Sequence, residues 1–254
     1  MDHFAPVRSD LKLKILLSLL NGEKKISELT ADVQTRETSI LHVLKEFESL
    51  NLTTKSGGIY KLTSLGLLNA QISKEWYTAS EVAEEFKDFW LLHDISDIPP
   101  HLMLRLGALK NSSLIKTETS ELSKVHQTFI HMLLSAKSIK GASPIFHPDF
   151  VGVFKQILSQ GGTIELILTN AVLQKTLATA ESELLKKYVT EGSLKIHIND
   201  NLKVALTITE NAFSLGLFNL KGEYDNNMDL LSFGQESIEW GSDFFKSLLK
   251  EEGG

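Results

Sequence analysis

The sequence predicts a two-part α/β protein: a small helical unit that ends in a β-hairpin, and a larger α/β sandwich with a mixed sheet. Three patterns support this fold class. Apolar residues recur at helical spacing as far as residue 50 and then give way to two extended segments around Ser56-Gly57-Gly58. A helical pattern without Gly or Pro follows Gly66, and from residue 138 strand patterns alternate with helical ones. The expected domains are 1–66, a linking or dimerisation helix at 67–93, and 94–254.

The composition indicates two cores and excludes several kinds of site. At 254 residues, 42% of them hydrophobic, the chain is long enough for two domains. It contains no cysteine, so disulfides, thiolate metal sites and a cysteine nucleophile are excluded. No apolar run approaches the roughly 18–20 residues of a membrane span, and Met1–Asp10 lacks the apolar core of a signal peptide. We therefore expect a cytoplasmic protein without membrane contact.

Charge is spread unevenly along the chain, whose formal net charge is −6. Residues 1–65 hold nine of the 26 Lys and Arg and eight of the 32 Asp and Glu, which leaves 17 and 24 for the remainder. A nearly neutral first part joined to an acidic second part fits a protein that touches DNA with one end only.

Three helices are expected before the hairpin. The first covers 11–21, the second covers 26–33, and the third follows the turn Gln34-Thr35. The expected N-caps are Ser9 or Asp10, Ser27 and Thr35.

The third helix is amphipathic. Its apolar stripe contains Ile40, Leu44 and Phe47, and its opposite arc carries Thr38, His42, Lys45 and Ser49. A helix divided in this way can lie in the major groove of DNA. The segments 52–55 and 59–62 flank two glycines that permit positive φ, which is the pattern of a β-hairpin. Three helices followed by such a hairpin are typical of a winged helix-turn-helix DNA-binding domain, in which the hairpin is the wing.

A single helical pattern runs from Leu65 to Trp90. Its apolar stripe consists of Leu68, Ile72, Trp76, Ala79, Ala83, Phe86 and Trp90. The stripe favours a dimerisation helix or a shaft between domains, or equally a helix that packs against the C-terminal domain. Because symmetric operators pair with two-fold protein dimers, we expect a homodimer.

The remaining elements predict a sheet with helices on its faces. Asp94–Thr117 is a junction with a short helix at 102–109, and a helix marked by Leu122 ends near Ala136. The expected strands are 138–142, 163–168, 193–198, 203–209 and 212–218, and the expected helices are 148–159, about 171–190 and 237–250. Strand–helix alternation followed by closely spaced strands predicts a partly parallel sheet with an antiparallel edge.

The segments ISELT and TRETSILHVLKEFESLNLTTKSGGIYKLTSLG carry recognisable motifs at Ser39, Leu44, Lys45, Phe47, Asn51-Leu52, Gly57-Gly58 and the run from Tyr60 to Gly66. By these motifs the first part resembles prokaryotic winged-helix transcriptional regulators related to the arsenic-repressor and MarR types. Asn51 stands where that group has Gly, and Asn also tolerates the left-handed conformation. The resemblance implies that Thr38, Ser39 and His42 face bases, while Arg36, Lys45, Lys55 and Lys61 contact phosphates. A winged helix used only for protein contacts is the alternative.

The second part contains DISDIPPHLMLRLGALKNSSLIKTE, IKGASPIFHPDF and GGTIELILTNAVLQKTL. By these segments it resembles the regulatory domain of archaeal methanogen regulators, the filamentation-regulator family, which combines this domain with a winged-helix head. The same region is distantly similar to the phospholipase-D-like sensor domain of archaeal sugar-responsive regulators.

The phospholipase D likeness can be tested against the residues that this chemistry needs. The motif H-x-K-x-x-x-x-D is absent, because His197 is followed by Ile198 and Asn199. His126 and His131 are five residues apart, which splays them on a helix, and no Walker loop or nucleophile-elbow motif occurs. We therefore expect no enzyme activity, no metal and no cofactor, with a degenerate hydrolase as the weakest alternative.

The residues that follow the expected strands 138–142 and 163–168 form a candidate ligand site. Ligands of open α/β sheets bind beyond the carboxyl ends of parallel strands, where helix N-termini present free N–H groups. Ser143, His147, Thr169 and Asn170 lie at such exits and could bind a small polar or anionic effector. The alternative is that His147 and Asn170 merely cap helices, and an apolar or peptide effector remains open.

These inferences predict an archaeal, dimeric transcriptional regulator whose second domain senses an effector and shifts the geometry of its DNA-binding heads. A non-catalytic adaptor that docks proteins is the alternative. The operator, the effector, the target genes and the sign of regulation are left open by the sequence.

Overall fold

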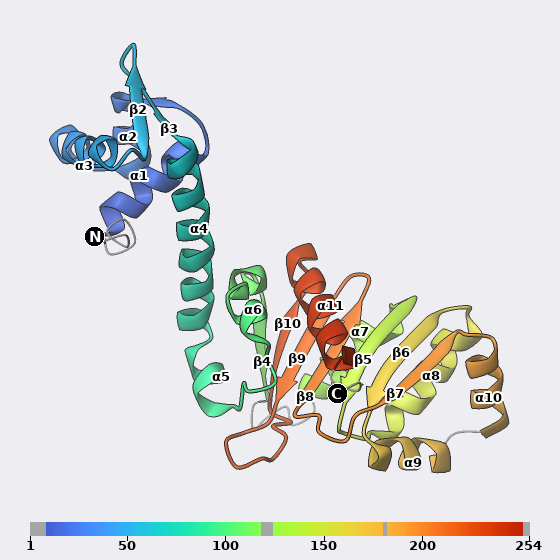
Figure 1. Cartoon of the computed structure of the whole chain (residues 1–254). Helices are drawn as coiled ribbons and strands as arrows, with labels where there is room; N and C mark the ends of the chain where they lie inside the picture. Colours follow the sequence, from blue (N-terminus) through green and yellow to red (C-terminus); the bar gives the residue numbers. More distant parts are fainter. Residues whose placement is uncertain (1–8, 118–123, 180–181, 251–254) are drawn as a thin grey trace. The chain divides into compact units, whose positions relative to one another are not determined.

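The computed structural model describes residues 9–117, 124–179 and 182–250 of a chain that divides into two compact units, Met1–Thr78 and Ala79–Gly254 (Figure 1). The boundary falls inside one helix, α4 (Ser64–Glu85), within the segment that the sequence marks as a linking helix. In the described ranges, no helix has the combined length and apolar character that crossing a bilayer requires.

The first unit contains three helices and a small antiparallel sheet. In order its elements are α1 (Asp10–Leu20), β1 (Lys24–Lys25), α2 (Ile26–Val33), α3 (Glu37–Ser49), β2 (Thr53–Ser56) and β3 (Ile59–Leu62). Strand β3 lies between β1 and β2, so the hairpin predicted from the glycines is present, with an additional two-residue strand that periodicity did not predict. Ile15, Leu29, Ile40 and Phe47 are fully buried and form the centre of this unit's core.

Two of the three predicted helix caps are wrong. Ser9 does cap α1, because its hydroxyl accepts a hydrogen bond from the Lys12 backbone N–H. Helix α2 begins two residues earlier than an N-cap at Ser27 requires. Pairing of β1 with β3 holds Lys25 extended, and Glu28 accepts from the Lys25 N–H at 2.6 Å. The N-cap residue of α3 is Arg36 rather than Thr35, and its side chain makes no capping bond.

The junction between the hairpin and α4 explains the Thr-x-x-Gly spacing at its end. The Thr63 hydroxyl accepts from the Gly66 N–H at 3.0 Å, and the Thr63 N–H donates to the Leu52 carbonyl at 3.0 Å. A Cβ at position 66 would lie 1.9 Å from that same carbonyl oxygen. Only glycine therefore lets α4 start this close to the strand. Asn51, just before Leu52, has a φ of 58°, as expected for a residue in the place of a glycine.

The second unit is built on a seven-stranded sheet, which is mixed as the sequence predicts. Its strands are β4 (Ser113–Lys116), β5 (Ser138–Ser143), β6 (Thr163–Leu168), β7 (Leu194–Ile198), β8 (Val204–Thr209), β9 (Phe213–Leu217) and β10 (Met228–Ser232). Their order is β4-β10-β9-β8-β5-β6-β7, in which β5, β6 and β7 are parallel and the other pairs antiparallel. Strands β4 and β10 were not predicted.

Helices cover both faces of this sheet (Figure 1). One face packs against α5 (Lys87–Leu92), α6 (Pro100–Met103), the 3-10 helix η1 (Leu106–Leu109) and α11 (Gln235–Lys250). The other packs against α7 (Lys124–Leu134), α8 (Pro148–Ser159), α9 (Asn170–Thr179) and α10 (Ser182–Thr190). The predicted helix at 102–109 is therefore two short helices. The Leu122 end of the helix predicted to finish near Ala136 lies outside the described residues.

The predicted Leu65–Trp90 helix is broken at Phe86, and its apolar stripe divides between two environments. Leu68, Ile72 and Trp76, in the first unit, are each more than half exposed. Phe86 is buried in the core of the second unit, where Trp90 packs, whereas Ala83 is exposed and Val82, outside the predicted stripe, is buried instead.

Replacement of Gly66 by alanine is expected to destabilise the first unit by roughly 3 kcal/mol, because the new methyl group must displace packed backbone. Urea unfolding followed by circular dichroism measures the change. Gly152→Ala in α8 is the matched control: its added Cβ meets nothing within 4 Å, so it should be neutral or stabilising by up to about 1 kcal/mol. Equal effects of the two substitutions would contradict the close approach of α4 to Leu52.

Candidate nucleic-acid interface and ligand cavity

Helix α3 has a fully buried face and an exposed polar face. Ile40, Val43, Leu44 and Phe47 are at most 4% exposed. The predicted base-facing and phosphate-facing side chains of Arg36, Thr38, His42 and Lys45 are exposed, and Ser39 is half-buried. Thr38, His42 and Lys45 lie at i, i+4 and i+7, so they share one side of the helix. The structure therefore presents these donors together.

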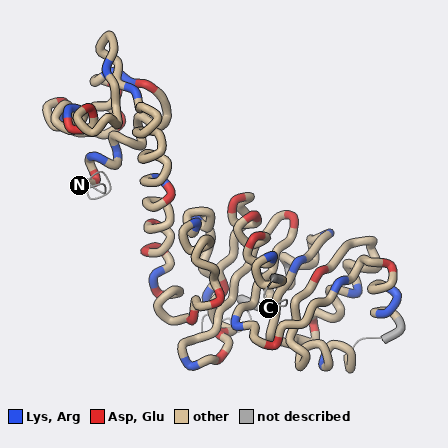
Figure 2. Tube along the Cα trace, in the orientation of Figure 1, with Lys and Arg blue, Asp and Glu red and all other residues tan. Residues whose placement is uncertain are grey.

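One acidic side chain of α3 is neutralised within the unit. Glu46 forms an ion pair with Lys12 of α1 at 2.5 Å. The first unit carries lysines on both α3 and the hairpin (Figure 2). Pairing of Glu46 reduces the repulsion that this carboxylate would exert on a nucleic-acid phosphate.

The two predicted phosphate contacts on the hairpin lie on opposite faces of it. Lys55 is paired with Tyr60 and Lys61 with Thr54 across the β2–β3 ladder, and residues directly opposite one another project to the same side. Lys55 lies over the Tyr60 ring at 5.0 Å, and a hydrogen bond with Tyr60 raises the pKa of Lys55. Both lysines are exposed, but one flat surface cannot contact both.

The second unit contains a cavity of about 640 Å³ between its sheet and helices α7 to α10. Two of the four predicted ligand residues, Ser143 and His147, line it. The Ser143 hydroxyl is bonded to the Ile145 backbone, and His147 also caps α8 by accepting from the Asp149 N–H at 3.3 Å.

Thr169 and Asn170 are not among the residues that line the cavity. The Thr169 hydroxyl accepts from the Val172 N–H, and the Asn170 side chain and backbone N–H both donate to Asp200, at 2.6 and 2.7 Å. These Asn170 bonds lower the pKa of Asp200. Because a carboxylate of the chain already occupies the N-terminus of α9, that site has little need of an anionic ligand.

The cavity exists because alternate residues of the central strands differ in size. On one face β8 and β9 present Val204, Leu206, Phe213 and Leu215, all buried in the core against α11. On the other face they present Ala205, Thr207, Ser214 and Gly216, which line the cavity. Gly141 of β5 stands beside Thr207 and continues this row of small residues. Small side chains on the strands leave space below the helices.

The described lining of this cavity includes one buried acidic residue, Asp229 of β10. It is 8% exposed, and its Oδ2 accepts a hydrogen bond from the Ser214 hydroxyl at 2.5 Å. Within the described ranges its other oxygen, Oδ1, has no hydrogen-bond partner. Burial raises the pKa of Asp229 to about 7, although the bond from Ser214 acts in the opposite direction.

The cavity wall beside Asp229 includes the loop between β9 and β10. Tyr224 of this loop lies against Gly216, where a Cβ would come within 2.3 Å of the Tyr224 hydroxyl. Burial, followed by the nearby Asp229 and Asp225 carboxylates, raises the pKa of Tyr224. Neither Asp229 nor Tyr224 was predicted as a site residue, because β10 was not recognised in the sequence. The small residues that alternate along β8 and β9 are the signal that could have indicated the cavity.

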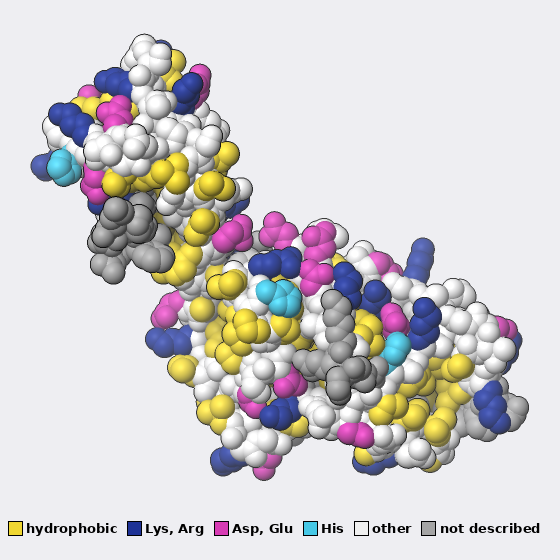
Figure 3. Space-filling view, in the orientation of Figure 1, with side chains coloured by type: hydrophobic (Ala, Val, Ile, Leu, Met, Phe, Trp, Pro, Cys, Tyr) yellow, Lys and Arg dark blue, Asp and Glu magenta, His cyan; other side chains and the backbone are white. Residues whose placement is uncertain are grey.

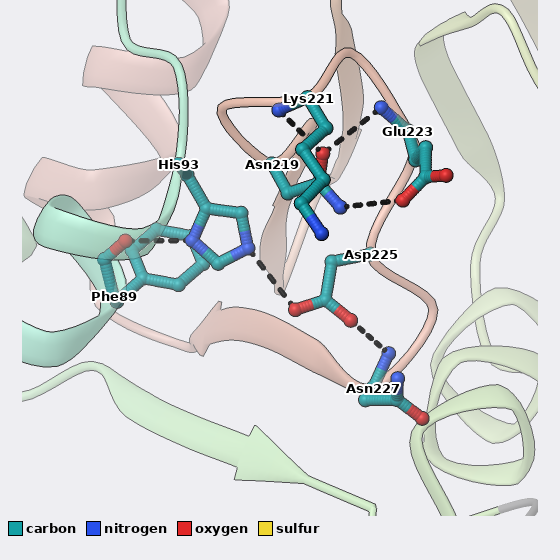
Figure 4. Close-up of polar contacts among 7 residues, drawn as sticks. All are labelled: Phe89, His93, Asn219, Lys221, Glu223, Asp225 and Asn227. Carbon is teal, nitrogen blue, oxygen red and sulfur yellow. Dashed lines mark hydrogen bonds and ion pairs between the residues drawn. The ribbon is translucent and has the colours of Figure 1, made fainter.

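The same loop is bonded to the end of α5, as Figure 4 shows. Buried His93 contacts the Phe89 carbonyl through Nδ1 at 2.6 Å and Asp225 Oδ2 through Nε2 at 3.2 Å. Asp225 Oδ1 accepts from the Asn227 N–H at 2.8 Å. The Asp94 N–H also donates to the Phe218 carbonyl at 2.8 Å. The loop that forms part of the cavity wall is thus fixed to the helix that follows α4.

Two known protein families match consecutive parts of the chain. The family described as "Methanogenesis regulatory protein FilR1, N-terminal domain" matches residues 5–76, and "Methanogenesis regulatory protein FilR1, middle domain" matches residues 122–251. The methanogenesis regulatory protein FilR1 of Methanothrix harundinacea (strain 6Ac) is 29% identical over 245 residues, which cover 94% of this chain and 54% of that protein. The chain therefore spans about half the length of this curated relative.

Solved structures resemble the chain only weakly. TrmBL2, described as an archaeal chromatin protein with a novel mode of DNA binding, is 13% identical with a TM-score of 0.45, over 95% of this chain and 92% of that one. An O-methyltransferase family protein from Burkholderia thailandensis is 12% identical with a TM-score of 0.27, over 74% of this chain and 58% of that one. Both scores are too low to carry a conclusion about fold or function.

Asp229 is expected to make stability depend on pH. Its pKa of about 7 lies above the ordinary value of 3.8, so between about pH 4 and 7 the unfolded chain ionises this group and the folded chain does not. Stability should fall across that window by up to about 4 kcal/mol, at 1.4 kcal/mol per pH unit, and level off above it. Asp229→Asn should remove this loss.

Urea unfolding monitored by tryptophan fluorescence at pH 5 and at pH 7.5 measures the difference. Asp88→Asn, which changes an exposed carboxylate of α5, is the control and should follow the wild-type profile. A profile for Asp229→Asn that falls as steeply as the wild type would contradict the assignment.

Proposed function

Because the chain belongs to the family of the methanogenesis regulatory protein FilR1, we propose that it is an archaeal transcriptional regulator that binds double-stranded DNA. In this proposal the first unit is a winged helix-turn-helix domain, with α3 as its recognition helix and the β2–β3 hairpin as its wing. The second unit is a sensor that binds a small effector. The protein acts in the cytoplasm and catalyses no reaction.

The observation that carries the proposal is the division of α3 into two faces. Its apolar side chains are at most 4% exposed, so the helix is anchored firmly while its opposite face remains open. On that face Thr38 and His42 offer hydrogen-bond donors and acceptors to base edges. Arg36 and Lys45 lie at the two sides of this pair along the helix and would meet phosphates. The hairpin would contact the backbone through Lys55 or Lys61 on either of its faces.

The exposed part of α4 supports a homodimer. Gly66, Ala70 and Ser73 face the core of the first unit and are buried, whereas the large apolar side chains of Leu68, Ile72 and Trp76 are 51–67% exposed. Hydrophobic side chains gather on the visible side of this helix in Figure 3. Large apolar groups at i, i+4 and i+8 on a helix surface suit an antiparallel or parallel pairing with the same helix of a second copy. Such a dimer would carry two recognition helices to successive major grooves.

Effector binding would act on the heads through contacts of the second unit. The cavity wall contains Tyr224, and the loop that carries it is bonded to His93 at the end of α5. A ligand that contacts this wall differently in two arrangements of the loop would shift the equilibrium between them. Because α5 follows α4, the altered position of α5 would reach the dimerisation helix.

The DNA-binding role is tested by electrophoretic retardation of the promoter of the protein's own gene over a salt series. We expect binding that weakens with salt, and a triple variant Arg36→Ala/His42→Ala/Lys45→Ala that binds at least tenfold more weakly. Removal of two phosphate contacts should also reduce the slope of log K against log salt by about 2.

A control variant replaces two lysines and one histidine of the second unit that are also exposed, Lys175, Lys195 and His101, by alanine. This variant should bind like the wild type. Failure to bind DNA at any salt concentration, or binding that salt does not weaken, would overturn the proposal and favour a protein-docking role.

The dimer is tested by Ile72→Glu, which places a charge in the exposed stripe of α4. We expect sedimentation equilibrium to give a dimer for the wild type and a dissociation constant raised at least a hundredfold for the variant, because a carboxylate would be buried without a partner. Lys74→Glu, on another side of the same helix, should leave the dimer intact. A monomeric wild type at micromolar concentration would exclude this dimer.

A further inference from the structure

Among the described residues that line it, the cavity of the second unit combines an apolar body with one acidic residue, Asp229. Most of its lining is aliphatic or aromatic, with Phe129, Phe150 and Phe154 from α7 and α8 opposite the sheet. Its volume of about 640 Å³ is within the range of sites for drug-sized ligands. At its sheet side, the small residues of β8 and β9 lead to Asp229.

One carboxyl oxygen of Asp229 is buried without a hydrogen bond from the described part of the chain. Oδ2 is bonded to Ser214, whereas Oδ1 finds no hydrogen-bond partner in the described part of the chain. A buried carboxyl oxygen without a partner is costly, and a hydrogen-bond donor brought by a ligand would remove that cost. The neighbouring Thr207, Ser214 and Tyr224 side chains carry hydroxyl groups and no positive charge.

We propose that this cavity binds a largely apolar molecule that ends in a hydrogen-bond donor, an amine or a hydroxyl group, and that the donor bonds to Asp229. This inference rests on the proposed sensor function and names the chemical class of its effector. An ammonium group fits best, because it supplies both the missing donor and the compensating charge. It differs from the polar or anionic effector that the sequence suggested.

The basic side chains on the lining do not offset Asp229. His147 is the N-cap of α8 and Lys155 lies within this helix, so both are on the helix side of the cavity. An Asp149 carboxylate oxygen lies 3.6 Å from Nδ1 of His147. An apolar molecule with a carboxylate would have to place its charge near these two residues instead. The position of the polar end therefore distinguishes the two classes of ligand.

Isothermal titration calorimetry of the full chain at pH 8 tests the inference with decylamine, decanol and decanoate, which share one chain length. We expect decylamine to bind at least tenfold more tightly than decanoate, with decanol between them. Asp229→Asn should weaken decylamine binding at least tenfold, which corresponds to about 1.4 kcal/mol, and should not weaken decanoate. Asp88→Asn, a surface carboxylate on α5, should leave all three affinities unchanged.

Ala205→Phe is a second variant that fills the cavity from β8 without touching Asp229, and we expect it to abolish binding of all three probes. The rank order in the wild-type protein needs no variant, so it stands even if Asp229→Asn does not fold. Decanoate binding as tightly as decylamine, no binding of any probe, or binding unaffected by Ala205→Phe would each overturn the inference.

The titrations contain no DNA, so their outcome does not depend on the regulator role. Retardation of the promoter with and without decylamine then tests the proposed function separately. Tight decylamine binding with unchanged DNA affinity would support the ligand class and contradict effector control. Intact DNA binding with no probe bound would leave the regulator proposal standing and overturn the ligand class.

Discussion

The second unit depends on the unequal filling of the two faces of its sheet. Residues of β8 and β9 that point toward α11 are large and apolar, and Phe213 packs edge-on against Trp240 at 5.7 Å. The Trp240 Nε1–H donates to the Leu102 carbonyl at 2.9 Å, so α11 also fixes the segment after α5. This solid face holds the strands in place while the opposite face remains hollow. The stability of one face permits a cavity on the other.

The apolar residues of the linking helix α4 also differ in burial between its two parts. Before the unit boundary the helix buries small residues and exposes large ones, and after it Val82 and Phe86 enter the second core. A large apolar side chain in solvent costs free energy that a second copy of the helix would recover. The same helix therefore packs into both units, and under the proposed function its exposed apolar side chains would contact a second copy.

Tertiary contacts connect the cavity wall to His93, the residue that follows α5. The loop after β9 contributes Tyr224 to the cavity, and Asp225, the next residue, bonds to His93. Alternate residues of an extended segment point to opposite sides, so a step of one residue takes the chain from the cavity to α5. A change at the cavity need not cross a long distance to reach α5.

The sequence by itself determined the elements whose signals are local. Helical periodicity located the buried face of α3, Gly57 and Gly58 located the hairpin, and Gly66 marked the start of α4. It did not determine β10 or the anchor Asp229, because a strand that begins Met-Asp after a polar turn has no periodic signal. Nor could it separate Lys55 from Lys61, since which face each occupies follows from the register of the ladder.

The sequence favoured Thr169 and Asn170 by position, although neither lines the cavity and Asp200, thirty residues beyond Asn170, already bonds to its amide groups. Pairings between distant residues decide these features, and no short-range pattern carries them.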